Sequence, residues 1–207
     1  MMMRRVACGL TAVLALGGVA ACTGNAPERS DAPPVIVPGG PGEPASTLPS
    51  GQTLPPAAQP NAADALFISR MVIHHQQALD MTALVPDRAA GATVKGVAAR
   101  IADSQRLEID AMNAWLKQHG HAGHDGMEMG AMPGMATPAQ LDALRAAKGA
   151  DFDTLFLQLM IAHHQGAVAM AQEIQNRGAD VRVQELADEV IAIQSAEINR
   201  MLGMVSH

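Results

Sequence analysis

The chain has few cysteines and almost no aromatic residues. Its 207 residues include two cysteines, three phenylalanines, one tryptophan and no tyrosine, so aromatic residues make up 2% of the sequence. The formal net charge is −6, with only 14 lysines and arginines. Nucleic-acid-binding domains usually carry a basic surface, often with stacking aromatic side chains. The composition therefore argues against a nucleic-acid partner.

The N-terminal apolar run is too short to cross a membrane as a helix of the mature protein. Arg4 and Arg5 precede this run at residues 6–20, and small residues then lead directly to Cys22. The pattern is typical of a bacterial lipoprotein signal over residues 1–22, in which the cysteine is acylated and becomes the mature N-terminus. A plain signal peptide or an uncleaved anchor is the alternative. We therefore expect an exported protein, anchored to a membrane through lipid on Cys22, on the outer side of the cytoplasmic membrane or in the periplasm.

The mature chain is expected to lack a free thiol. Cys8 is removed with the signal and Cys22 is acylated, so neither a disulfide nor a thiolate metal site is predicted. Any soft metal ligand must then be a methionine thioether, and the chain has 14 methionines.

Two further regions follow the signal. Residues 23–60 contain ten of the thirteen prolines and are predicted to be a disordered tether with polyproline character. Residues 61–207 have the length of one domain and are predicted to fold as a unit. A loop rich in histidine, methionine and glycine interrupts this domain at residues 119–136.

One stretch of the domain occurs twice, 89 residues apart. Residues 64–81 read DALFISRMVIHHQQALDM, and residues 153–170 read DTLFLQLMIAHHQGAVAM. At the same separation, Gln105, Glu108 and Met112 correspond to Gln194, Glu197 and Met201. The correspondence predicts a duplicated unit of two successive elements.

Apolar residues at three- and four-residue steps predict helices near residues 61–85, 93–119, 138–148, 151–176 and 180–204. Thr137, followed by Pro138 and then Gln140, has the signature of a helix start, and Gly120 has that of a helix end. Two helical hairpins with matching apolar stripes cannot each bury their faces alone. The sequence therefore predicts an all-α fold, an antiparallel four-helix bundle built from two duplicated helical hairpins.

Histidine and methionine share the apolar stripe of each copy. On a helical wheel His74 lies with Met71 and Met81, whereas His75 turns to the other side. Imidazole suits copper, zinc and nickel, and a thioether favours copper, especially Cu(I). The mixture predicts copper, with Glu108 and Glu197 either orienting the histidines or forming register-setting hydrogen bonds. The alternative is a core in which methionines are filler and histidines are hydrogen-bonded.

The glycine-rich loop adds further soft and borderline ligands: His119, His121, His124, Met127, Met129, Met132 and Met135. Such a composition is suggestive of weak metal capture, and the alternative is a flexible connector.

The motif M-I/V-x-H-H-Q-x-A-x-x-M occurs twice, and each copy is followed by Q-x-x-E-I-x-x-M. This arrangement resembles the domain-of-unknown-function family 305 over residues 61–206. The resemblance implies a ferritin-like bundle that is secreted or lipid-anchored, with copper binding and resistance in some members. The ligands that it implies are His74, His75, His163, His164, Met71, Met81, Met160 and Met170, with Met112 and Met201 as further candidates.

Three functions compete. The first is a copper-binding lipoprotein that buffers or sequesters the metal, with a copper-handling protein or further copies of the chain in a homo-oligomer as its partners. The second is a di-iron oxidase, which uses Glu-x-x-His on bundle helices. Met71 and Met160 stand three residues before His74 and His163, where that motif needs glutamate, so an enzyme is not expected. The third is a structural or partner-binding bundle without metal.

Overall fold

The computed structural model describes residues 35–37, 44–49, 52, 58–120 and 132–205. The chain divides into two units, Met1–Pro55 and Pro56–His207. In the first unit, β1 (Val35–Val37) and β2 (Ser46–Leu48) form an antiparallel pair. The sequence predicts disorder for this segment and does not predict the pair, which β-branched residues such as Ile36 and Thr47 favour.

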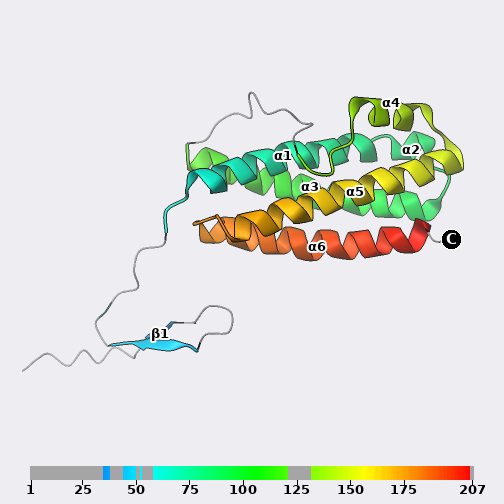
Figure 1. Cartoon of the computed structure of the whole chain (residues 1–207). Coiled ribbons are helices and arrows are strands. Elements are labelled where there is room, and N and C mark those ends of the chain that lie inside the picture. Colours follow the sequence, from blue (N-terminus) through cyan, green and yellow to red (C-terminus); the bar gives the residue numbers. More distant parts are fainter. Residues whose placement is uncertain (1–34, 38–43, 50–51, 53–57, 121–131, 206–207) are drawn as a thin grey trace, which may run out of the picture. The chain divides into compact units, whose positions relative to one another are not determined.

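The second unit is helical, as predicted (Figure 1). Its long helices are α1 (Ala62–Thr82), α3 (Ala92–Gln118), α5 (Gly149–Gln175) and α6 (Val181–Val205), and its short ones are α2 (Val85–Arg88) and α4 (Pro138–Ala146). None of the described helices is both long and apolar enough to cross a membrane.

The ends of the helices follow from local side-chain chemistry. The Asn61 side chain accepts hydrogen bonds at the start of α1, and Thr137 forms the predicted capping box with Gln140 at α4. Gly120 follows α3 with a φ of 74°, as the predicted glycine stop requires. The first helix, predicted to reach residue 85, ends at Thr82. Pro86 lies in the first turn of α2, where a proline costs no helical hydrogen bond.

The long helices lie side by side lengthwise (Figure 1). Within each half of the chain the two long helices pack on one another, α1 on α3 and α5 on α6, and the halves meet where α1 packs on α5. Met71 of α1 shares a buried cluster with Met170 of α5, whereas Met81 shares another with Met160. Helices α1 and α5 therefore run antiparallel.

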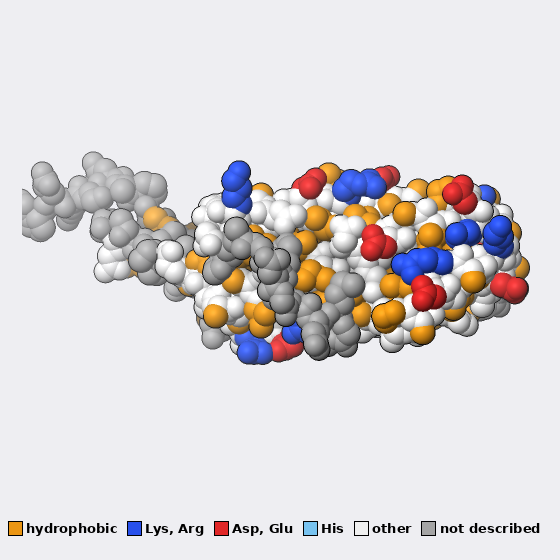
Figure 2. All heavy atoms as spheres, turned by 90° about the horizontal axis from the view of Figure 1, so that it is seen from above, with side chains coloured by type: hydrophobic (Ala, Val, Ile, Leu, Met, Phe, Trp, Pro, Cys, Tyr) orange, Lys and Arg blue, Asp and Glu red, His pale blue; other side chains and the backbone are white. Residues whose placement is uncertain are grey.

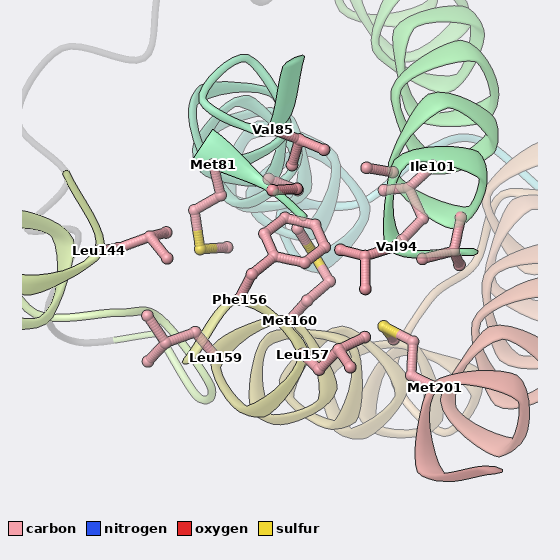
Figure 3. Packing of buried hydrophobic residues seen from close by; sticks show 14 of the residues in the cluster. Met81, Val85, Val94, Ile101, Leu144, Phe156, Leu157, Leu159, Met160 and Met201 are labelled. Atoms are coloured by element: carbon pink, nitrogen blue, oxygen red, sulfur yellow. The ribbon is translucent and has the colours of Figure 1, made fainter. Parts of the chain in front are cut away.

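The core has two apolar clusters with a polar layer between them. The cluster in Figure 3 contains Phe156, Met160 and Ile101, and the second contains Met112 and Trp115. Along each long helix the buried residues change from one cluster to the other, and a buried polar side chain stands at the change. These side chains are His74, His75, Gln105, His163, His164 and Gln194. The fold thus places six polar side chains between the two apolar clusters of the core.

Two aspartates tie the halves of the domain together in equivalent ways. Asp64 accepts hydrogen bonds from the backbone N–H groups of Ala179 (3.1 Å) and Asp180 (3.2 Å). Asp153 accepts from those of Ala90 (3.2 Å) and Gly91 (2.7 Å). Each donor and each acceptor has its counterpart 89 residues away. An aspartate of each half therefore accepts hydrogen bonds from a loop of the other half. Aspartate recurs at this position because a carboxylate is a strong acceptor for paired N–H groups.

Candidate metal site

The four histidines of the doubled motif are fully buried, at 0% exposure. The face in Figure 2 shows charged and hydrophobic side chains intermingled and no histidine among the described residues. A buried imidazole loses its hydration, so it requires hydrogen-bond or metal partners inside the protein.

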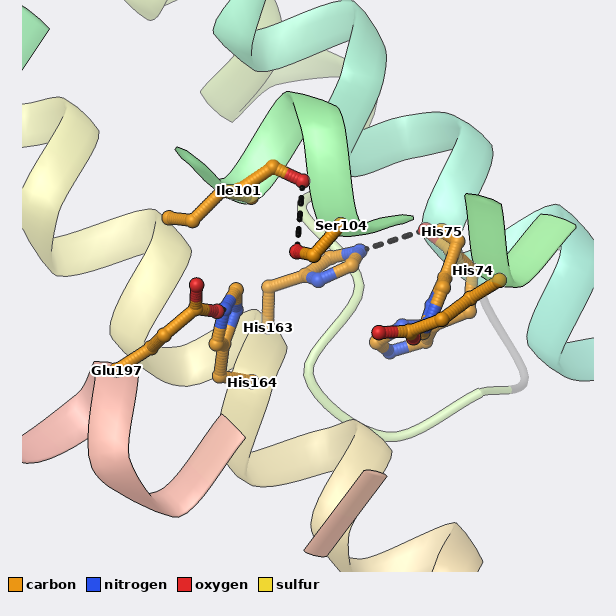
Figure 4. A network of polar contacts seen from close by, with 8 residues as sticks. His74, His75, Ile101, Ser104, His163, His164 and Glu197 are labelled. Atoms are coloured by element: carbon orange, nitrogen blue, oxygen red, sulfur yellow. Dashed lines mark hydrogen bonds and ion pairs between the residues drawn. The ribbon is translucent and has the colours of Figure 1, made fainter. Parts of the chain in front are cut away.

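His74 and His163 form a central pair where α1 meets α5 (Figure 4). Their ring centroids lie 3.8 Å apart. The Nε2 atom of His163 contacts the backbone carbonyl of His74 at 2.8 Å, and the Nε2 atom of His74 contacts the carbonyl of Pro133 at 3.0 Å. A carbonyl can only accept, so both Nε2 atoms carry the proton and both Nδ1 atoms keep a lone pair. Within the described residues neither Nδ1 atom has a hydrogen-bond partner.

The central pair is held uncharged. Burial is the largest cause, and it lowers the pKa of His74 to about 3, against a smaller opposite effect of the Pro133 carbonyl. Burial and then the neighbouring His74 ring hold the pKa of His163 well below its ordinary value of 6.5. Neutral imidazole is the form that binds a metal ion. The pair therefore stays in the uncharged form, which is able to ligate a metal ion, over the physiological range of pH.

His75 and His164 turn away from the central pair, as the helical wheel predicts. The Nε2 atom of His75 lies 2.6 Å from Oε2 of Glu108 on α3, and that of His164 lies 2.8 Å from Oε2 of Glu197 on α6. The carboxylates accept from Nε2, and within the described residues the Nδ1 atoms again have no hydrogen-bond partner. A carboxylate on the second imidazole nitrogen is the usual arrangement behind a metal-ligating histidine.

Two glutamines join this layer, although the sequence marked them only as corresponding positions of the two copies. Gln105 and Gln194 are 1% exposed, and within the described residues neither amide has a hydrogen-bond partner. Unpaired buried amides are rare because each costs about 1–3 kcal/mol. Their match across 89 residues was the available signal, since a polar residue repeated on an apolar stripe is unusual.

The six methionines predicted on the helices are buried but do not gather at one point. Met81, Met160 and Met201 lie in one apolar cluster, and Met71, Met112 and Met170 lie in the other. Each central histidine has a methionine three residues earlier on its own helix, and that spacing puts the two side chains on one face.

The loop predicted to capture metal is described only at its ends. His119 stacks on Trp115 with ring centroids 4.3 Å apart, and its Nδ1 atom donates to the Trp115 carbonyl. Met132 is buried and Met135 is half-buried, both against the cluster of Met71. The remaining predicted residues lie outside the described ones: His121, His124, Met127, Met129 and the lipid-anchor residue Cys22.

The histidine and methionine side chains suit a soft or borderline metal ion, but they do not form a complete coordination site. Among the described residues, no group of three or more histidines, cysteines, aspartates or glutamates lies close enough to hold an ion. The Nδ1 atoms of all four histidines nevertheless have no hydrogen-bond partner in that part of the chain. A site made from them must be completed by thioethers or by a movement of side chains.

Known proteins resemble this chain in sequence and in structure. A candidate secreted protein from Streptomyces coelicolor, of the family called Domain of unknown function (DUF305), is 33% identical with a TM-score of 0.65, over 70% of this chain and 92% of that one. The protein CopM in its Cu(I)-bound form is 33% identical with a TM-score of 0.60, over 69% of this chain and 95% of that one.

A shorter match joins the chain to a protein of Acanthamoeba polyphaga mimivirus. This uncharacterized protein, L153, is 43% identical over 49 residues, which span 24% of this chain and 32% of that protein. The family model for DUF305 matches residues 64–205, from the aspartate of the first repeat to the end of α6. The chain therefore belongs to the DUF305 family.

Proposed function

We propose that the protein binds copper outside the cytoplasm and buffers or sequesters it, without catalysing a reaction. The observation that carries this proposal is the set of four buried imidazoles whose Nδ1 atoms have no partner within the described residues. Each of them has its Nε2 proton engaged by an oxygen atom. That combination leaves one nitrogen of each ring free to ligate and fixes which one it is.

The chemistry of the neighbouring side chains favours copper over zinc. Met71 and Met160 stand one helical turn before His74 and His163, and a thioether is a ligand for Cu(I) and a poor one for Zn²⁺. The similar protein CopM has been crystallised with Cu(I), with Cu(II) and with silver, which are soft or borderline ions. The ligands we propose for the first ion are the Nδ1 atoms of the central pair with these two thioethers.

The architecture that we propose is an antiparallel four-helix bundle formed from two duplicated hairpins. The equivalent aspartate caps at Asp64 and Asp153 support it, and so do the equivalent histidine–glutamate contacts in the two halves. In such a bundle the doubled motif meets itself at the centre, and this is where His74 and His163 lie. Copper would thus be held between the halves.

Export and anchoring complete the proposal. Residues 1–22 have the pattern of a lipoprotein signal, and acylation of Cys22 would fix the protein to a membrane surface. The similar protein from Streptomyces coelicolor is named as a candidate secreted protein. Outside the cytoplasm a copper protein without free thiols keeps its ligands under oxidising conditions.

Competition for Cu(I) with a chromophoric chelator tests the proposal. The wild-type chain is compared with His74→Ala/His163→Ala and with the matched pair His75→Ala/His164→Ala, each checked for helix content by circular dichroism. We expect the central pair of substitutions to weaken Cu(I) binding by at least about a hundredfold, the effect of losing two ligand bonds of about 1.4 kcal/mol each.

The competing function is a structural bundle in which the histidines are core hydrogen-bonders, and the bonds of all four Nε2 atoms favour it. If that function is correct, the wild-type chain will bind Cu(I) no more tightly than a variant with alanine at all four histidines. Its melting temperature will also be the same with copper and with a chelator.

A further inference from the structure

A short segment, residues 132–136, crosses α1 and α5 beside the central histidine pair and is called the strap here. In Figure 1 it is the described trace that leads into α4. The Gln77 side chain of α1 holds it at one end, donating to the Ala136 carbonyl (3.0 Å) and accepting from the Ala136 N–H (2.7 Å). At its other end Met132 is buried in the apolar cluster of Met71.

Between these two anchors the backbone of the strap touches α5 directly. A Cβ atom built on Gly166 would lie 1.9 Å from the Pro133 carbonyl oxygen. A Cβ atom on Gly134 would lie 2.3 Å from the Ala162 carbonyl oxygen, and the φ of Gly134 is +76°. Glycine is required at both positions, since any side chain would separate the strap from the helix.

The two repeats differ at the residues that hold the strap. In the otherwise matching H-H-Q-x-A stretch, Gln77 of the first repeat corresponds to Gly166 of the second. The hydrogen bonds differ in the same way, because His163 donates to the carbonyl of its counterpart His74, whereas His74 donates to the strap at Pro133. The two copies of the motif therefore have different hydrogen-bond partners at the place where the strap contacts them.

We propose that Gln77 and Gly166 are positioning residues that act on His74 through the strap. By holding the Pro133 carbonyl against Nε2, they keep the proton on that atom and leave Nδ1 as the ligating atom. The strap in this position also slows the entry of copper to the central pair, since both rings are fully buried and the strap contacts the ring of His74. The inference rests on the proposed copper site, but the state of His74 can be measured in metal-free protein.

The experiment uses the full mature chain with Gln77→Leu and Gly166→Ala. Gly203→Ala on α6 is the matched control, because a Cβ atom there meets nothing within 4 Å. The first readout is solvent exchange of the imidazole Nε2 protons in metal-free protein, followed by ¹⁵N-edited NMR. The His163 proton, which donates to the backbone of α1, is the internal reference in each spectrum. The second readout is the rate of Cu(I) uptake from a chelator by stopped flow.

We expect about tenfold faster exchange of the His74 proton in Gln77→Leu, the size of losing one to two neutral hydrogen bonds. Cu(I) uptake should accelerate by a similar factor, with Gly203→Ala unchanged in both readouts. If Gly166→Ala fails to fold, Gln77→Leu alone tests whether the strap positions His74. Folded variants whose His74 exchange stays within twofold of wild type would overturn the inference. If the wild-type chain takes up no copper, the proposed function falls, and proton exchange alone judges whether the strap positions His74.

Discussion

Acid should destabilise the metal-free protein through the central histidine pair. The folded state holds the pKa of His74 at about 3, against 6.5 for the exposed side chain, so the unfolded chain binds an additional proton between these two values. The contribution of neutral His74 to the free energy of unfolding is therefore fully present above pH 6.5, and it is lost as the pH decreases through this window. His163, whose pKa is lowered in the same direction by burial and by His74, adds to the loss.

The size of the effect follows from the pKa difference. At pH 5 the solution lies about 1.5 units below the unfolded pKa, and each unit corresponds to 1.36 kcal/mol, so His74 alone removes about 2 kcal/mol from the free energy of unfolding. A domain is stable by only about 5–15 kcal/mol, so the change is large enough to measure.

Urea unfolding with a chelator present, at several pH values from 7.5 to 5, measures the loss. The single tryptophan, Trp115, lies in the second core cluster and serves as the fluorescent probe. His74→Gln and His163→Gln replace each ring by a side chain that does not titrate, so the carboxylates contribute equally to wild type and variants. We expect the stability advantage of wild type to shrink with falling pH. A difference between wild type and His74→Gln that stays constant from pH 7.5 to 5 would refute the reasoning.

Three further predictions concern unfolding free energies, each measured by urea denaturation. Asp64→Ala should cost about 3 kcal/mol and Asp153→Ala about 2 kcal/mol, because only the first carboxylate is fully buried and it has more N–H partners. Glu108→Gln and Glu197→Gln should each cost about 1–2 kcal/mol, and unequal losses would contradict the equivalence of the two histidine contacts. Met132→Ala should cost about 2–4 kcal/mol if the strap is packed as the structure has it, and a loss below 1 kcal/mol would contradict that packing.

The helices could be predicted from sequence because their causes are local. Apolar residues at helical spacing marked the buried faces, and Thr137 and Gly120 marked ends that the structure confirms. The separation of His74 from His75 followed from the 100° step between neighbouring residues on a helix. The wheel could also place the methionines on the stripe, but it could not sort them between two clusters, since that depends on how α1 and α5 are aligned.

The strap could not be predicted, because its contacts leave no pattern of side chains. The partner of His74 is a backbone carbonyl 59 residues away, and the position of Gly166 is explained only by the backbone that lies on it. The exchange of Gln77 for Gly166 was visible as a mismatch between the repeats. A mismatch in a duplicated motif marks a place where the two halves have different neighbours, and here the neighbour is the strap.

The doubled motif does not imply two equal copper ions. The rings of His74 and His163 lie 3.8 Å apart, and two cations that close in a buried site would repel each other strongly. We therefore expect the central pair to share one ion, whereas His75 and His164, each on its own glutamate, belong to separate positions. Cu(I) titration should then show that His74→Ala and His163→Ala each weaken the binding of the same single equivalent, so that the double variant loses no more equivalents than either single variant. Loss of two equivalents in the double variant, with one in each single variant, would show that the repeats bind independently.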